Sequence, residues 1–221
     1  MKIAKYSVLI GAIVLPFLIG CGNTNPKSNV EIEEFNDSVS VIECVTDKKI
    51  PDGFTLGRVV DCKGHSKEEE NMLSQFQSYN SALLRGDIDN AIHYQYPDAA
   101  KYFKKYYPSE SYDGVMRKLF EDLSMQTIEG LKRFESHGIE VNIVVSRLIR
   151  KVTYGENIFY VFEIVSNMVS NNLQIYTTPD LTLAVSSNNG KNWTFNAMNE
   201  DTPNILRISH SNEIVDKVMG Y

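Results

Sequence analysis

The chain has 221 residues, of which 43% are hydrophobic and 23% are charged, so it carries enough apolar material for a globular core. Its formal net charge of -6 argues against a nucleic-acid-binding protein, which needs clustered Lys and Arg. Its 3 cysteines are too few for a disulfide-dense miniprotein, and a mean hydropathy of -0.25 excludes a protein with many membrane spans.

Residues 1–20 have the pattern of a secretory signal peptide. Lys2 and Lys5 provide the positive start, and residues 6–20 form an apolar run that is short of the roughly 20 residues a spanning helix needs. The run ends at Cys21 in the tetrapeptide Leu-Ile-Gly-Cys, which resembles the bacterial lipobox. The alternative is that Cys21 is simply a small residue near the cleavage site.

The lipobox resemblance implies cleavage before Cys21 and acylation at that residue, so that the mature protein is held on a membrane by its lipid chains. The folded part is then outside the cytoplasm, in the cell envelope. Gly22 stands where an inner-membrane retention signal would have Asp, which slightly favours the outer membrane. Residues 21–39 are polar and lack a sustained period, and are predicted to be a flexible tether.

Residues 40–65 are predicted to form a small segment containing Cys44 and Cys62. A strand around Cys44, a Pro-Asp-Gly turn at residues 51–53 and a returning segment would bring the two thiols together. Disulfides persist outside the cytoplasm, so a Cys44–Cys62 bridge is expected, with two free buried thiols as the alternative. A metal site is disfavoured because no Cys-x-x-Cys spacing is present.

Residues 66–138 have helical periodicity. Ser66 and Glu69 form a capping box before an apolar stripe that ends at Gly86. Asp87 is expected to cap a second helix, Pro97 to begin a short third one, and Ser111 to begin the longest, which closes at residues 137–138.

After residue 138 the apolar period changes from about 3.6 to 2, which predicts strands. The strands are expected over residues 139–152, 158–165, 173–185 and 193–197, with a phase slip at residues 144–145 that indicates a bulge. Residues 158–165 are apolar on both faces, as in a covered central strand, and Pro179 interrupts the third strand. A final helix is expected from Ser211. The prediction is an α+β fold in which helices precede a strongly curved, four-stranded antiparallel sheet.

This order of elements resembles the NTF2-like superfamily, also called SnoaL-like or cystatin-like. The resemblance rests on the helix ending in Leu-Leu-Arg-Gly-Asp at residues 83–87, the Tyr-Pro-Asp at residues 96–98, and the terminal hairpin at residues 188–195 with its Gly-Lys-Asn-Trp turn. It implies that residues 66–221 form a cone, which in this superfamily often holds a pocket. Members include enzymes, transport factors, secretion-system parts and lipoproteins, so the resemblance bears on fold more than on activity.

The first functional hypothesis is a non-catalytic module that binds a small apolar ligand or an envelope protein. Tyrosines gather near the expected mouth of the cone, and each offers an apolar ring with a hydroxyl. The alternative for any one of them is that its ring fills the core. The mouth tyrosines are Tyr79, Tyr94, Tyr96, Tyr102, Tyr106, Tyr107 and Tyr160, and the predicted pocket set is Tyr79, His93, Tyr94, Tyr102, Tyr160 and Glu163.

The second hypothesis is an enzyme like ketosteroid isomerase or SnoaL, acting on a small apolar substrate with a carboxylate base. Glu163 is the best candidate because it interrupts an apolar strand, although it could equally pair with Arg147 or Arg150. The third hypothesis is a structural subunit of an envelope assembly. No nucleotide or hydrolase motif is present, His93, His137 and His210 are too scattered for a metal site, and no cofactor is expected.

Overall fold

The computed structural model describes residues 31–34, 43–45, 58–59, 61–63, 66–170, 173–176 and 179–221. The predicted signal peptide at 1–20, the lipidation site Cys21 and most of the predicted tether lie outside these residues. Within the tether range, Glu31–Glu34 form strand β1, which pairs antiparallel with β5 (Glu140–Tyr154). That part of the predicted tether is therefore assigned to the sheet, because its backbone pairs with residues 150–153 despite its polar sequence.

Helices occupy most of residues 67–136, as the sequence predicted. They are α1 (Lys67–Arg85), α2 (Ile88–His93), α3 (Pro97–Phe103), a short 3₁₀ turn (Lys104–Tyr106) and α4 (Tyr112–Ser136). The capping box at the start of α1 is present, and Gly86 ends the helix with a φ of 68°, a left-handed conformation that glycine adopts without strain. Asp87 and Ser111 each accept a hydrogen bond at the start of the next helices.

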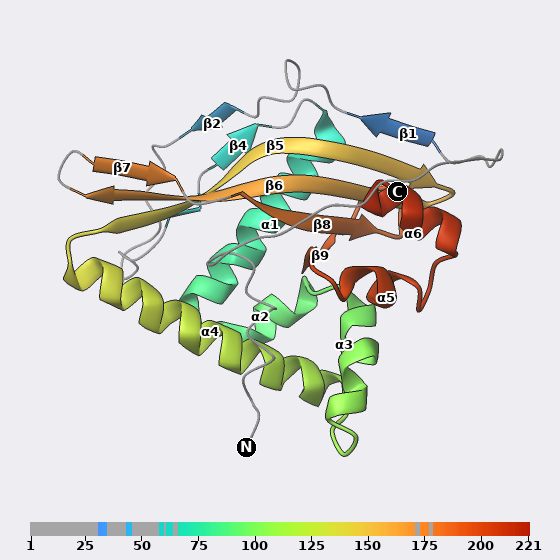
Figure 1. Ribbon diagram of the computed structural model, residues 1–221, viewed down its shortest axis with the longest axis horizontal. Helices are drawn as coiled ribbons and strands as arrows, with labels where there is room; N and C mark the ends of the chain where they lie inside the picture. Colours follow the sequence, from blue (N-terminus) through green and yellow to red (C-terminus); the bar gives the residue numbers. More distant parts are fainter. Residues whose placement is uncertain are drawn as a thin grey trace.

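A sheet follows, built on four antiparallel strands in the order β5, β6, β8, β9, and the fold is therefore α+β (Figure 1). These strands are β5 (Glu140–Tyr154), β6 (Asn157–Ser170), β8 (Asp180–Ser186) and β9 (Thr194–Ala197). Three short strands extend this sheet: β1 and the parallel β3 (Arg58–Val59) on β5, and β7 (Leu173–Tyr176) on β6. Sequence reasoning missed β1 and merged β7 with β8 across Pro179, whereas β3 lies in the returning segment expected after the Pro-Asp-Gly turn.

The register of β5 against β6 shifts twice, between Val145 and Arg147 and between Leu148 and Arg150. The predicted phase slip at residues 144–145 therefore corresponds to a real irregularity beside it. A separate two-stranded sheet pairs β2 (Glu43–Val45) with β4 (Asp61–Lys63), with Cys44 directly opposite Cys62. The backbone pairing needed for the predicted bridge is thus present, while the bridge itself stays a prediction.

Both faces of β6 are buried, in separate apolar clusters. Tyr160 and Phe162 pack against α1, in one cluster with Trp193 and Phe195. Phe159 and Val161 pack with residues of α3, α4, α5 (Thr202–Leu206) and α6 (Asn212–Met219). Because successive strand residues point to opposite faces, the sheet carries helices on both of its faces. The prediction of a covered central strand is confirmed. Sequence reasoning missed α5 (Thr202–Leu206) but predicted α6 (Asn212–Met219), which closes the second cluster.

Candidate functional site

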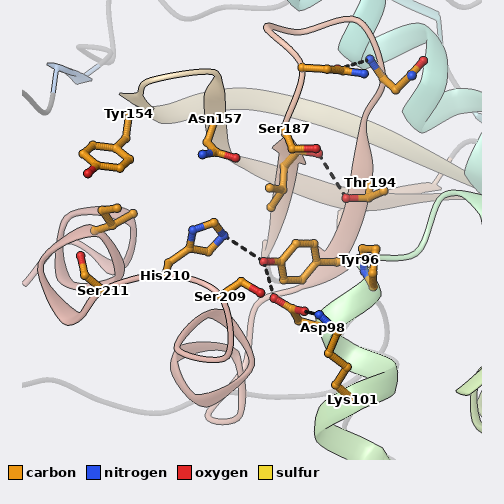
Figure 2. Close-up of a pocket in the computed structure, with 15 residues that line it drawn as sticks. Tyr96, Asp98, Lys101, Tyr154, Asn157, Ser187, Thr194, Ser209, His210 and Ser211 are labelled. Carbon is orange, nitrogen blue, oxygen red and sulfur yellow. Dashed lines mark hydrogen bonds and ion pairs between the residues drawn. The ribbon is translucent and has the colours of Figure 1, made fainter.

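A pocket of about 740 Å³ lies where one end of the sheet meets α3 and the C-terminal helices. The start of α3, the β5–β6 turn, the end of β8, the start of β9 and the loop between α5 and α6 all contribute to it (Figure 2). The lining residues are Tyr96, Pro97, Asp98, Lys101, Tyr154, Asn157, Val185, Ser187, Asn188, Asn192, Thr194, Ser209, His210, Ser211 and Ile214.

Backbone pairing fixes Tyr96 at this place. The Tyr96 amide donates to the Phe195 carbonyl at 3.1 Å, and the Phe195 amide donates to the Tyr94 carbonyl, so the chain before α3 runs beside β9. Pro97 then begins α3, where a missing amide proton costs no hydrogen bond, and Asp98 falls in its first turn. Pro97, which the sequence predicted to begin the third helix, therefore also helps to set the position of a polar cluster.

The cluster is a chain of hydrogen bonds centred on Asp98, which is only 3% exposed. The Tyr96 hydroxyl donates to Asp98 Oδ2 at 3.0 Å, and Lys101 Nζ lies 2.5 Å from Oδ1. The Ser209 hydroxyl also hydrogen-bonds to this carboxylate. Burial alone would raise the pKa of Asp98, but the bonds from Lys101, Ser209 and Tyr96 outweigh it and hold that pKa below its ordinary value.

His210 extends this chain into the pocket, with its Nε2 lying 3.0 Å from the Tyr96 hydroxyl (Figure 2). Burial lowers the pKa of His210, only partly offset by the charge on Asp98, so its neutral form is favoured. Burial, together with Asp98, raises the pKa of the Tyr96 hydroxyl, which therefore keeps its proton.

These bonds assign the protons. An ionised carboxylate only accepts, so the single proton of the Tyr96 hydroxyl points to Asp98. Toward His210 the same oxygen can then only accept, and Nε2 must carry the imidazole proton. In the neutral ring, Nδ1 is left with a lone pair, and no described residue donates a hydrogen bond to it. The site thus presents a fixed hydrogen-bond acceptor.

The residues predicted as a pocket set do not line this pocket. Tyr79 and Tyr94 pack against Phe195 in the apolar cores, and burial raises the pKa of Tyr79. Tyr160 is fully buried with its hydroxyl donating to Glu68, and Tyr102 donates to Asp201 at 2.5 Å. These four rings therefore fit the alternative stated for the tyrosines, in which the ring packs within or against an apolar core and does not line a pocket.

The two remaining members of that set also lie elsewhere. His93 is exposed at the end of α2. Glu163 lies on β6, and its Oε2 is 3.3 Å from Arg147 Nε. An ion pair with Arg147 was one of the two alternatives to a catalytic role for Glu163 in the sequence interpretation. Within the described parts of the chain, no group of three or more metal-ligating side chains is found.

Sequence reasoning placed Tyr96 among the mouth tyrosines but missed Asp98 and His210 as site residues. Asp98 has a signal in the Tyr-Pro-Asp sequence, although an acidic residue in a first helical turn is also common for electrostatic reasons alone. His210 lies in a Ser-His-Ser loop more than a hundred positions from Tyr96. Only the packing of α5 and α6 on the sheet brings them together.

Comparisons with known proteins return no relatives. No protein-family model matches the chain, and neither a curated protein nor a solved structure is similar to it. A search of the described residues for membrane-spanning segments finds no helix with the necessary length and apolarity.

Proposed function

We propose that this chain is a lipid-anchored, NTF2-like lipoprotein of the bacterial cell envelope that binds a small ligand in the pocket around Tyr96 and His210. The observation that carries the binding role is the pocket itself. Its volume is typical of small-molecule sites, and polar groups from four separate parts of the chain converge on it. The binding role is non-catalytic.

The NTF2-like assignment is supported by the order of elements, with four helices before the antiparallel strands β5, β6, β8 and β9. The Tyr-Pro-Asp sequence that contributed to the resemblance lies in the pocket wall. The strong curvature of an NTF2-like cone is part of this proposal.

The lipid anchor is supported by the sequence of residues 1–21. Labelled palmitate should enter the wild-type protein, and Cys21→Ser should prevent labelling and release the protein from the envelope fraction. Retention of Cys21→Ser in that fraction, or absence of label in the wild type, would contradict the anchor. Slight preference for the outer membrane follows from Gly22 and is tested by fractionating the two membranes.

Native mass spectrometry of the full chain in detergent tests the binding role. We expect a bound mass with the wild type and its loss in Ser187→Trp, because Ser187 is an exposed lining residue whose replacement fills the pocket without entering the core. Lys191→Trp is the matched control, since Lys191 is exposed in the same hairpin but does not line the pocket. A bound mass that persists in Ser187→Trp would contradict this assignment.

A second candidate function is acid–base catalysis, favoured by the hydrogen-bonded chain from His210 through Tyr96 to Asp98. A neutral imidazole held in one tautomer is suited to accept a proton from a substrate. Unlike the ketosteroid-isomerase hypothesis, this version does not use Glu163. Turnover of a bound molecule by the wild type, abolished in His210→Gln while binding persists, would favour it over simple binding.

The Cys44–Cys62 disulfide also remains a proposal, supported by the antiparallel register that sets the two residues opposite each other. Alkylation of the unfolded, non-reduced protein should leave both thiols unmodified, with both modified after reduction. Modification of both before reduction would contradict the bridge.

A further inference from the structure

The charges around the pocket indicate what kind of ligand it accepts. Among its lining residues only Asp98 and Lys101 carry full charges, and they form an ion pair with each other. His210 is favoured in its neutral form. An anion would find no unpaired cation here, and a cation would find a carboxylate that already has three hydrogen-bond donors. The pocket is therefore suited to an uncharged ligand.

The remaining polar groups show that this ligand must hydrogen-bond. Within the described part of the chain, the side chains of Tyr154, Asn157, Ser187, Asn192 and Ser211 make no hydrogen bond to any other residue. Hydroxyl and amide groups can both donate and accept. Together with the lone pair on His210 Nδ1, they offer a mixed set of donors and acceptors around one space.

An apolar ligand would leave these groups without partners once water is displaced, and each such loss is costly. A molecule whose own groups both donate and accept, such as an alcohol with many hydroxyls, satisfies them. Sugar hydroxyls have this property. They also provide the O–H donor that the unprotonated Nδ1 of His210 requires.

A sugar ring also has an apolar face, and the pocket has surfaces for it. Tyr154 is 45% exposed at the β5–β6 turn, where its ring is free to cover a ligand. Val185 and Ile214, which are largely buried, are the small apolar members of the lining. A tyrosine ring supplies contact area at low conformational cost and keeps a hydroxyl for hydrogen bonding.

We propose that the pocket binds a neutral saccharide, with a sugar hydroxyl donating to His210 Nδ1 and the Tyr154 ring packing on the sugar face. This inference rests on the proposed binding function and specifies its ligand class. It replaces the apolar ligand expected from the sequence, because that expectation was based on seven tyrosines of which only Tyr96 lines this pocket.

Isothermal titration calorimetry on the full chain in detergent tests the proposal with maltotriose, mannotriose and the trimer of N-acetylglucosamine as probes. We expect at least one of them to bind the wild type. Tyr154→Ala should weaken that binding about tenfold through loss of the ring contact, and Tyr154→Phe only about threefold through loss of one hydrogen bond. Tyr112→Ala is the control, since Tyr112 is 54% exposed on α4 and does not line the pocket.

The same titrations with a neutral steroid and a blocked, uncharged tetrapeptide test the two proposals separately. They show whether the saccharide proposal can fail while the proposed binding role of the pocket stands. Failure of all three saccharides to bind overturns the saccharide proposal, as does saccharide binding that Tyr154→Ala and Ser187→Trp leave unchanged. Steroid or peptide binding that Ser187→Trp abolishes would, in that case, leave the proposed binding role standing. If no probe binds and no bound mass is found in the envelope-derived protein, both proposals fail.

Discussion

Gln95 and Tyr96 are neighbours in the chain, yet they belong to two polar networks of opposite kinds. Gln95 accepts a hydrogen bond from the Tyr79 hydroxyl and donates to Asn196, whose own amide donates to the Ala197 carbonyl, so this network is closed inside the protein. Tyr96 connects Asp98 to His210, and that network ends in an acceptor at the pocket surface.

The difference separates groups that hold the fold from groups available to a ligand. A closed buried network contributes to stability because every member has a partner, whereas an open one keeps part of its hydrogen-bonding capacity. Substitutions in the two networks should therefore change different measurements.

Gln95→Ala should have the largest effect on stability. It leaves the buried Tyr79 hydroxyl and the Asn196 carbonyl oxygen without partners, at a cost of about 3 kcal/mol in the free energy of unfolding. Urea denaturation measures this value. Gln77→Ala on α1 is the control, because the Gln77 side chain makes no hydrogen bond within the described residues and its loss should cost less than about 0.5 kcal/mol. Equal losses in the two variants would contradict the closed network.

Asp98→Asn should lower the free energy of unfolding by about 2 kcal/mol at neutral pH, because a neutral amide replaces a charged carboxylate that accepts three hydrogen bonds. The folded pKa of Asp98 lies below its ordinary value, so the wild type gains this stability above about pH 4 and loses it as the pH falls toward the folded pKa. The Asn variant should lack that acid dependence. Asp89→Asn, on the exposed Asp89–Arg117 pair, should cost less than about 0.5 kcal/mol.

Tyr96→Phe should cost about 1 kcal/mol, since one hydroxyl connecting Asp98 and His210 is lost while the ring remains. Saccharide binding should also weaken in this variant, because nothing then fixes the proton on His210 Nε2. Calorimetry and urea denaturation measure the two effects. Tyr112→Phe should change neither the saccharide affinity nor the free energy of unfolding. If Tyr112→Phe lowered them as much as Tyr96→Phe, the Tyr96 hydroxyl would have no special role.

His210→Gln should change the free energy of unfolding least at neutral pH. Its main effect should be on how that free energy depends on pH. The folded pKa of His210 is lowered, so the unfolded chain binds the proton more tightly. The free energy of unfolding of the wild type should therefore rise with pH between the folded pKa of His210 and about 6.5. Above about pH 6.5 the contribution of His210 should no longer change with pH. His210→Gln should lose that slope, whereas His93→Gln, at an exposed position, should keep it. A slope retained in His210→Gln would contradict the assignment.

Much of the fold could be predicted from the sequence because its signals are local. The capping box at Ser66, the left-handed Gly86, the cap at Ser111 and the change of period after Gly138 each act within a few residues. The strand β1 could not, since its polar sequence lacks a period and its pairing partner is more than a hundred residues away in β5.

The site was harder to predict for the same reason. The tyrosines were chosen as candidates because they are numerous. Whether a tyrosine ring lines a pocket or fills a core depends on its burial, and burial is set by segments distant in the sequence. Asp98 and His210 have ordinary local roles in a first helical turn and an interhelical loop. Their shared function appears only when α5 and α6 pack against the sheet and bring His210 to Tyr96.

The most direct test of the site is the protonation of the His210 ring. A long-range ¹H–¹⁵N spectrum of the full chain at pH 7, assigned with His210→Gln, reports which ring nitrogen carries the proton. The orientation of the Tyr96 hydroxyl toward Asp98 predicts a neutral ring with its proton on Nε2 and a bare Nδ1. A proton on Nδ1 alone, or a doubly protonated ring at that pH, would contradict the acceptor that the ligand proposal requires.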